Sequence, residues 1–274
     1  MTTENNGPRK RFLALDTSTA TLGVVVTENY QVLHEINTSG ERNHSVHLLP
    51  IIEQALQASG TSGSMLAGIS VGIGPGSYTG TRIAVSAAKT LAWAWDVPVA
   101  GISTLHALAW GGHEQGRMAS YSPTPAEQGQ VEYGPDWIIP LIDARRGQAF
   151  TGLFAVGAEG SPTRLEPDAI RLMSEWVLQL SELIGLAEAE GRKPRNLWFT
   201  GETALHGSSE TLSALAGLCH LNVVPYELEG RWTGFLGEER HAAGNDDVHS
   251  LIPNYTQLTE AEVNLRKSHE GGMK

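Results

Sequence analysis

The sequence has 274 residues, 41% of them hydrophobic and 18% charged, which is the composition of a globular protein with one large domain or two moderate ones. It holds no run of eighteen apolar residues, so it predicts no transmembrane helix. Its one cysteine, Cys219, excludes an intrachain disulfide and a multi-cysteine metal site, and both observations favour a cytoplasmic protein. The formal net charge of −11 argues against direct nucleic-acid binding, because a polyanion needs a basic patch to displace its counterions.

The first part of the chain predicts a short tail followed by a β-rich start. Residues 1–9 are polar and are expected to be disordered. The stretch RFLALDTSTATLGVVVTENYQVLHEINT (11–38) predicts two or three strands, because apolar and β-branched runs are separated by a polar turn at Asp16 to Thr19. The next stretch, NHSVHLLPIIEQALQASG (43–60), predicts a helix from apolar residues at helical spacing, with Ser45 as its N-cap.

The central part predicts strands and helices around a glycine-rich loop. LAGISVGIG (66–74) is expected to be a strand that enters the loop GPGSYTG (74–80), and TRIAVSAAKTLAWAW (81–95) is expected to be a helix. PVAGIS (98–103) predicts a strand, and TLHALAWG begins another helix. Residues 111–135 are rich in glycine, proline, serine and glutamine, and we interpret them as a long exposed loop or insertion.

The second half repeats the order of the first, with strands before interleaved helices. Residues 136–156 predict two strands joined by a turn at Arg145 to Gly147. Helices are expected in SEWVLQLSELIGLAEAE and SSETLSALAGLC, and strands in NLWFTGE and LNVVPY. This pattern favours an α/β protein of two similar lobes. The predicted division is an N-terminal lobe over 10–110, a C-terminal lobe over 136–262 and a tail over 263–274.

The glycine-rich loop resembles a phosphate-binding loop but satisfies neither common motif. A P-loop needs G-x-x-x-x-G-K-[ST], whereas Gly76 and Gly80 have a different spacing and no lysine follows. A dinucleotide fingerprint needs G-x-G-x-x-G, and Gly80 comes one residue too late. Alanines dominate the helix that follows and let another backbone come close. Close helix packing or an interface is therefore one interpretation, and anion binding at the helix N-terminus is the other.

A second candidate is the polar turn of Asp16, Thr17, Ser18 and Thr19 between two predicted strands. In a phosphate site the hydroxyls and turn amides would hold phosphate oxygens, and the carboxylate would position a metal ion or water. The alternative is a self-capping turn, since Asp, Ser and Thr side chains hydrogen-bond to neighbouring backbone groups.

Other candidate groups favour structural roles. At the strand end DARR, Asp143 and Arg146 could bind a ligand together, but a structural ion pair is the commoner arrangement. Metal-binding histidines usually lie four residues apart with a third ligand, and these histidines do not: His44, His47, His106 and His113. The sequence therefore predicts no metal site.

Four stretches, taken together, resemble one known family: LALDTSTATLGVVV, NHSVHLLPIIEQAL, GIGPGSYTGTRIAVSAAKTLAWAWDVPVAGISTLHALA and PLIDARRGQAF. Their combination is similar to the bacterial TsaB (YeaZ) family of tRNA threonylcarbamoyladenosine biosynthesis. The resemblance implies the actin/Hsp70/sugar-kinase-like (ASKHA) fold, an α/β architecture of two lobes with mixed sheets flanked by helices. In that superfamily the first hairpin turn is a phosphate loop, which implies weak nucleotide or phosphate binding by Asp16, Thr17, Ser18 and Thr19.

The resemblance also implies a role without catalysis. The family's catalytic relative, TsaD, carries a metal-binding histidine pair after the strand that matches PVAGIS, and STLHALAWGGH lacks such a pair. The chain is therefore expected to be a non-catalytic scaffold that binds and supports TsaD. Two helices are expected to form the contact, with these residues at the interface: His47, Leu48, Ile51, Ile52, Arg82, Val85, Ala88, Lys89 and Ala92.

The resemblance implies TsaD and TsaE as partners, with a second copy of the chain as another occupant of the same helices. It further implies indirect contact with tRNA, no membrane contact and no cofactor for this chain, although ATP or ADP could bind at the interface of the complex. One alternative is an ATP-dependent phosphotransferase or ATPase of the same fold, for which Asp143 is the comparable catalytic residue, but DARRGQ lacks the usual glycine pair. Another is a metalloprotease-like protein, against which the missing histidine pair argues.

Overall fold

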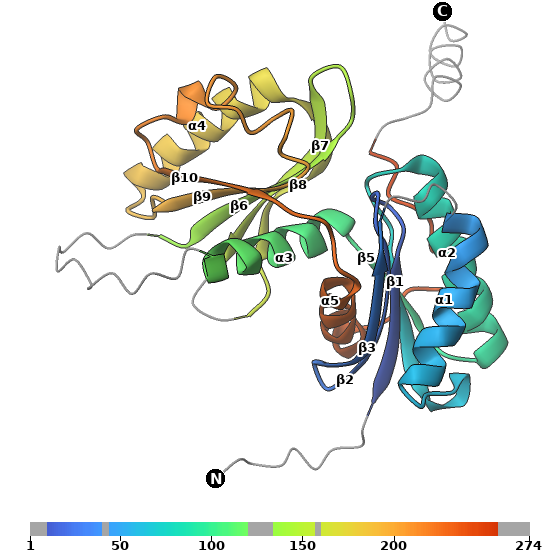
Figure 1. The fold of residues 1–274 in the computed structure, drawn as a ribbon. Helices are drawn as coiled ribbons and strands as arrows, with labels where there is room; N and C mark the ends of the chain where they lie inside the picture. Colours follow the sequence, from blue (N-terminus) through green and yellow to red (C-terminus); the bar gives the residue numbers. More distant parts are fainter. Residues whose placement is uncertain (1–9, 40–43, 120–133, 157–159, 257–274) are drawn as a thin grey trace, which may run out of the picture.

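The computed structural model describes residues 10–39, 44–119, 134–156 and 160–256, which form two five-stranded sheets (Figure 1). The first sheet consists of β1 (Arg11–Asp16), β2 (Leu22–Glu28), β3 (Gln31–Thr38), β4 (Leu66–Gly72) and β5 (Val99–Ile102). Its strand order is β3-β2-β1-β4-β5. The first three strands pair antiparallel as a meander, whereas β4 pairs parallel with β1 and with β5.

The second sheet repeats the topology of the first. It consists of β6 (Asp136–Asp143), β7 (Gln148–Val156), β8 (Thr163–Leu172), β9 (Asn196–Gly201) and β10 (His220–Pro225). From its antiparallel edge the order is β8-β7-β6-β9-β10, with the same succession of antiparallel and parallel pairs as in the first sheet. The prediction of an α/β protein with two similar lobes built on mixed sheets is therefore confirmed.

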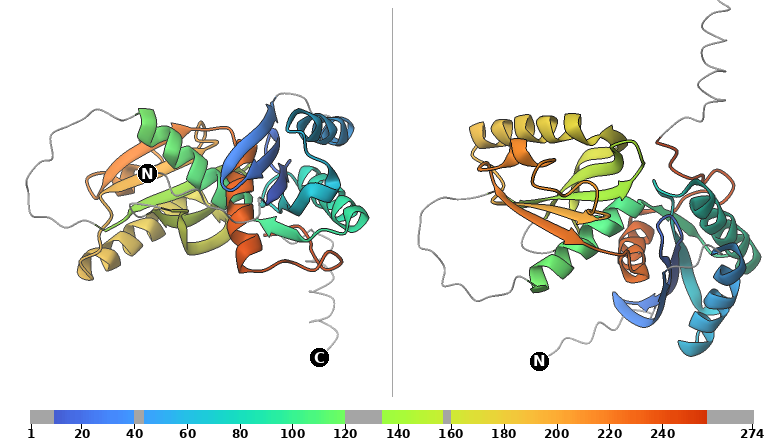
Figure 2. Two further views of the ribbon diagram at one scale, coloured as in Figure 1. Left: turned by 90° about the horizontal axis from the view of Figure 1, so that it is seen from below. Right: turned by 45° about the horizontal axis from the view of Figure 1, so that its top comes forward.

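Helices cover the two sheets in alternating layers (Figures 1 and 2). The helices are α1 (His44–Ala58), α2 (Tyr78–Trp95), α3 (Thr104–Ala119), α4 (Met173–Ala189) and α5 (Gly230–Ala243). α1 and α2 cover the outer face of the first sheet, α5 covers its inner face, and α4 covers the outer face of the second sheet. α3 packs on the inner face of the second sheet and contacts α5. Apolar cores fill the space between each sheet and its helices.

The two outer helices of the first half form for the reasons that the sequence indicates. Ser77 Oγ accepts a hydrogen bond from Gly80 N–H (3.2 Å) and caps the start of α2. The buried residues of α1 are Leu48, Ile52 and Ala55, which share one helical face against the first sheet. The prediction of Ser45 as the N-cap of α1 is wrong, because the helix already begins at His44.

Residues 111–119 belong to helix α3, which corrects the prediction of a loop over 111–135. Residues 120–133 lie outside the described ranges. Gly112 and Gly116 lie so close to β9 that a Cβ atom would overlap the side chains of Thr200 and Trp198. Glycine costs a helix about 1 kcal/mol relative to alanine, so the composition predicts a loop. Close packing on the sheet outweighs that cost.

The spatial halves do not follow the predicted division of the sequence into lobes. Helix α3 packs on the second sheet although it begins in the predicted N-terminal lobe, and α5 packs on the first sheet although it lies in the predicted C-terminal lobe. The chain after α5 stays with the first sheet, since Asp246 N–H donates to Val99 O (2.9 Å) and Asn254 N–H donates to Ile73 O (2.7 Å). The two halves are therefore interlocked through the middle layer.

Three elements of the second half differ from the sequence prediction. Of the helix expected in SSETLSALAGLC, the structure contains a single 3-10 turn, Ser213–Leu215. Strand β8 was not predicted, because its exposed and half-buried residues show no clear alternation. Helix α5 was not predicted either, because Gly230, Gly234 and Gly237 weaken its helical pattern.

Candidate functional site

The turn after β1 is closed by hydrogen bonds within the chain. The Asp16 side chain is buried; its Oδ1 accepts from Ser18 N–H (2.8 Å) and its Oδ2 accepts from Thr104 Oγ1–H (2.8 Å). Burial raises the pKa of the Asp16 carboxyl, and hydrogen bonds from Ser18 and Thr104 oppose this shift. Thr17 Oγ1–H donates to Gly80 O (2.6 Å). The polar groups predicted to hold a phosphate therefore bind the chain itself.

The glycine-rich loop GPGSYTG packs directly on this turn. Ser77 N–H donates to Ser18 O at 2.7 Å. A Cβ atom at Gly76 or Gly80 would overlap the carbonyl oxygen of Ser18 or of Thr17, so the close approach requires glycine at both positions. The loop thus seals the turn instead of cradling a ligand. The four residues predicted to bind phosphate are buried or half-buried: Asp16, Thr17, Ser18 and Thr19.

The equivalent turn of the second half, after β6, is built around Asp143. Its Oδ1 accepts from Arg145 N–H (3.1 Å) and lies 3.0 Å from Nε2 of the buried His206, with which it shares a hydrogen bond. The Asp143 N–H donates to Glu202 Oε2 (2.8 Å). The ion pair that the sequence favours between Asp143 and Arg146 is not formed; the Asp143 carboxylate contacts His206 instead.

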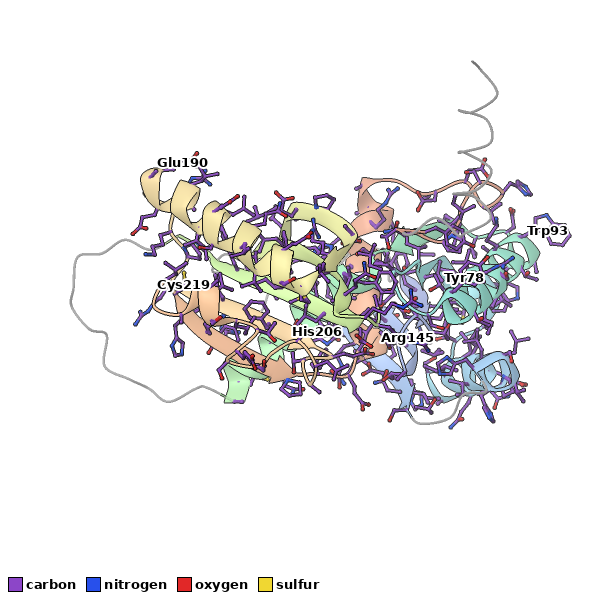
Figure 3. All side chains as sticks on the ribbon, turned by 90° about the horizontal axis from the view of Figure 1, so that it is seen from above. Tyr78, Trp93, Arg145, Glu190, His206 and Cys219 are labelled. Atoms are coloured by element: carbon purple, nitrogen blue, oxygen red, sulfur yellow. The ribbon has the colours of Figure 1, made fainter. Side chains whose placement is uncertain are left out.

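This second turn has an unusual backbone. Arg145, Arg146 and Gly147 have φ angles of 67°, 53° and 73°, a left-handed conformation that suits glycine and costs an arginine about 1–2 kcal/mol. Both arginine side chains are exposed, and neither forms an ion pair with any residue in the described ranges. Figure 3 shows Arg145 where the two halves meet and His206 nearby on the second half. The turn presents two guanidinium groups to solvent.

A cavity of about 770 Å³ lies between the two halves. Its walls come from the β1–β2 turn at Thr21, from β3 at Asn37, from α3 at Gln115, and from the ends of β9 and β10 with the segments that follow them. Three of its lining residues are glutamates: Glu202, Glu227 and Glu229. No lysine, arginine or histidine of the described chain lines it. The carboxylates of this lining disfavour the entry of a nucleotide polyphosphate.

Five of the predicted interface residues lie in the chain's own core. They are Leu48 (1% exposed), Ile52 (3%), Val85 (3%), Ala88 (0%) and Ala92 (1%). These side chains pack between α1, α2 and the first sheet and cannot reach a partner, so the prediction is wrong for them. An apolar helical stripe shows that one face of a helix is buried but not what covers it, and here the first sheet covers it.

The other predicted interface residues are exposed or half-buried: His47, Ile51, Arg82 and Lys89. Lys89 Nζ donates to His249 O (3.0 Å) and Leu251 O (2.9 Å), so its ammonium group holds the chain's own C-terminal segment. Arg82 donates from a terminal guanidinium nitrogen to Tyr78 Oη (3.0 Å). Of these four residues, Arg82 is the exposed one, and it lies beside an aromatic ring.

The outward face of α1 and α2 carries large apolar side chains that the sequence reasoning missed. Val46, Leu49, Tyr78 and Trp93 are 66%, 57%, 51% and 72% exposed. Leu49, Tyr78 and Ile83 also line a groove of about 480 Å³ between the two helices. We call these five residues the α1–α2 surface; Figure 3 shows Trp93 projecting from it, away from the second half. Val46 and Leu49 share a face by their three-residue spacing, a signal present in the sequence.

The histidines of α3 are packed within the protein. His106 Nε2 lies 2.6 Å from Pro162 O, and its ring stacks on Phe154. Burial lowers the pKa of His106 to about 4. His113 packs edge-on against Trp198. Across the described ranges, no group of three His, Cys, Asp or Glu side chains could hold a metal ion, and no helix is long and apolar enough to cross a membrane.

Comparisons with known proteins agree with the sequence resemblance. Residues 31–206 match the family described as TsaD, tRNA N6-adenosine threonylcarbamoyltransferase. The tRNA threonylcarbamoyladenosine biosynthesis protein TsaB of Bacillus subtilis is 34% identical over 265 residues, which cover 94% of this chain and 99% of that protein. The Escherichia coli TsaB is 28% identical over 178 residues, or 61% of this chain and 69% of its own.

The solved structures show the shared fold. A Pseudomonas aeruginosa protein similar to peptidase YEAZ covers 90% of this chain and 100% of its own, with a TM-score of 0.66 and 20% identity. YeaZ from the same organism covers 90% of this chain and 99% of its own, with a TM-score of 0.64 and 20% identity. The chain therefore has the fold of the YeaZ structures, the two-lobed ASKHA architecture.

Proposed function

The chain belongs to the TsaB (YeaZ) family, and from this premise we propose that it is a non-catalytic subunit that binds and activates a TsaD-type threonylcarbamoyltransferase in tRNA threonylcarbamoyladenosine synthesis. The observation that carries the proposal is the exposed α1–α2 surface. The transferase is the natural partner, because the same family model matches this chain and TsaD, so the two proteins have related folds.

The α1–α2 surface has the composition of a protein interface. Tryptophan, tyrosine and arginine dominate the binding energy of such contacts; Tyr78 and Arg82 lie together at the start of α2, and Trp93 lies near its end. Val46 and Leu49 add aliphatic area on α1. Large apolar side chains that are exposed along two neighbouring helices and line a groove between them mark an interaction site.

The lack of catalysis is part of the proposal and is supported by three features of the described chain. The Asp16 turn is sealed by the glycine-rich loop, so its carboxylate faces Thr104 instead of a ligand. His106 and His113 are packed among aromatic rings. The interlobe cavity is acidic, which disfavours the alternative of an ATP-dependent phosphotransferase or ATPase. We propose that the chain needs no cofactor of its own, and that ATP or ADP binds at the interface of the complex.

The remaining partners are part of the same proposal. A second copy of the chain competes with the transferase for the α1–α2 surface, so a homodimer and the heteromeric complex exclude each other. TsaE joins through the transferase. The net charge of −11 keeps the isolated chain from tRNA, so RNA binding depends on the complex. The proposed compartment is the cytoplasm.

The binding experiment uses the full chain and the TsaD-type protein of the same organism. Leu49→Asp and Trp93→Asp place charges on the α1–α2 surface, and each is expected to weaken binding in calorimetry at least about tenfold. The matched control is Leu178→Asp, because Leu178 is 57% exposed on α4 at the other side of the molecule. Equal affinity of the three variants and the unsubstituted chain would contradict the proposed surface.

The activity experiment tests the role. Modification of tRNA in vitro is expected to need both proteins, and the purified chain alone is expected not to hydrolyse ATP above background. A robust ATPase rate that is lost in Asp16→Ala would favour the alternative enzyme, because it would show that the sealed turn opens for a nucleotide.

A further inference from the structure

We propose that Arg145 and Arg146 bind phosphate groups of the RNA backbone when the chain is part of the transferase complex. The inference rests on the proposed function and replaces its indirect contact with tRNA by a direct one at the turn after β6. The ligand chemistry is a pair of backbone phosphates, which guanidinium groups bind through two parallel N–H donors.

The backbone of the turn is the first observation. Two arginines occupy left-handed φ values of 67° and 53°, where glycine or asparagine would be less strained. The surrounding structure enforces this conformation, because Asp143 accepts from Arg145 N–H and is itself held by the buried His206. Gln148 N–H closes the turn on Arg145 O at 2.9 Å. Strain that persists in a supported turn points to a function for the side chains it presents.

The electrostatic setting is the second observation. Both guanidinium groups are exposed in a protein of net charge −11, yet neither pairs with a carboxylate in the described ranges. Each therefore retains its full capacity to bind an anion. The glutamates of the neighbouring cavity, Glu202 among them, repel a small polyphosphate that would enter between the halves. A phosphate outside the cavity, on an extended backbone, is the anion that this geometry favours.

The choice of RNA over an acidic protein segment follows from the assembly. The transferase is proposed to bind the α1–α2 surface, on the outer side of the first sheet. Arg145 lies elsewhere, where the two halves meet (Figure 3). The proposed reaction brings an extended row of tRNA phosphates to the complex, whereas ATP or ADP is proposed to bind at the interface with the transferase. The acidic chain alone repels RNA, so the arginines contribute after the transferase has bound it.

The experiment compares three variants of the full chain in complex with the transferase. Arg145→Gln with Arg146→Gln removes both charges, and Arg145→Gly with Arg146→Gly removes the charges and the backbone strain. Arg117→Gln is the control for the loss of one exposed positive charge, since Arg117 is 63% exposed on α3; each double variant removes one charge more. Affinity for the transferase without RNA is measured first, and then the affinity of each complex for tRNA at several salt concentrations.

We expect all variants to bind the transferase equally and both double variants to bind tRNA more weakly than the Arg117→Gln complex. The slope of log affinity against log salt should fall by about 1.4–1.8, because each lost phosphate contact removes about 0.7–0.9. The double glycine variant should also melt about 2–4 °C higher, since relief of the left-handed strain exceeds the added chain entropy.

Three outcomes would overturn the inference. If both double variants had the tRNA affinity and salt slope of Arg117→Gln, the two arginines would make no contact with RNA phosphates. A loss of affinity for the transferase in the absence of RNA would assign the arginines to a protein carboxylate. A Tm that does not rise in the double glycine variant would show that the arginines are not strained in the left-handed conformation. Failure of the unsubstituted chain to bind the transferase would instead refute the proposed function, and this inference with it.

Discussion

Replacement of Asp16 by alanine measures how firmly the turn after β1 is held. The Asp16 carboxylate accepts hydrogen bonds from Ser18 N–H and Thr104 Oγ1–H, both at 2.8 Å and both buried. Alanine leaves these two donors without an acceptor in a site that the glycine-rich loop closes to water. An unsatisfied buried donor costs about 1–3 kcal/mol, so with two donors we expect Asp16→Ala to lower the free energy of unfolding by about 2–6 kcal/mol.

The matched variant is Asp16→Asn, which keeps the shape and one acceptor oxygen but does not titrate. Burial raises the pKa of the Asp16 carboxyl above its ordinary value of 3.8, so the folded protein disfavours the charged form. The stability of the unsubstituted protein relative to Asp16→Asn should therefore be greatest below pH 3.8 and decline as the pH rises through the folded-state pKa.

The assay is urea unfolding followed by the fluorescence of the seven tryptophans, at constant m-value. A loss below about 0.5 kcal/mol for Asp16→Ala, the size of an ordinary surface substitution, would refute the reasoning, because it would mean that the two donors find other partners. A thermal shift by ATP that is present in the unsubstituted chain and absent in Asp16→Asn would show that the turn opens for phosphate.

Three further predictions concern buried groups. Gly80→Ala should destabilise the protein by about 1–3 kcal/mol, because the new methyl group overlaps Thr17 O, and an unchanged urea midpoint would contradict this. Ala88→Glu should abolish the native near-UV circular dichroism, since it places a charge in the core; a folded variant that loses only partner binding would restore the original interface prediction. As the pH falls from 6.5 to about 4, the unfolded state takes up a proton on His106 that the folded state does not, so the free energy of unfolding should fall by up to about 3 kcal/mol. His106→Gln should remove this part of the acid destabilisation, and parallel pH profiles of the two proteins would disprove the prediction.

The outer helices show both what the sequence could predict and what it could not. Apolar spacing predicts α1, and the alanine-rich stretch 81–95 predicts α2 three residues short of its start at Tyr78, because such patterns are local but do not fix where a helix begins. The same spacing does not say what covers the apolar face. Ala88 looks suited to a close helix contact, but the partner in that contact is the chain's own sheet. The proposed partner surface is on the opposite face of α2, where Trp93 is 72% exposed.

The middle layer was not predictable from local patterns. Helices α3 and α5 lie between two sheets, so their contacts on both sides demand small residues. Gly116 meets the side chain of Trp198, and Gly237 meets that of Ser70, where a Cβ atom would overlap in each case. Glycine lowers helix propensity, so the feature that lets these helices fit is the one that makes their sequences resemble loops. Tertiary packing decides the structure here.

The two turns show how one topology supports two different roles. Asp16 and Asp143 end equivalent strands, and each accepts a hydrogen bond from the N–H two residues ahead. After β4 the chain crosses the Asp16 turn with its glycine-rich loop and enters α2, which carries part of the proposed partner surface. After β9 it supplies His206 beneath Asp143 and forms a 3-10 turn where the first half has α2. The long helix and the buried turn therefore arise together in the first half. The second half, without that helix, leaves its turn open and charged.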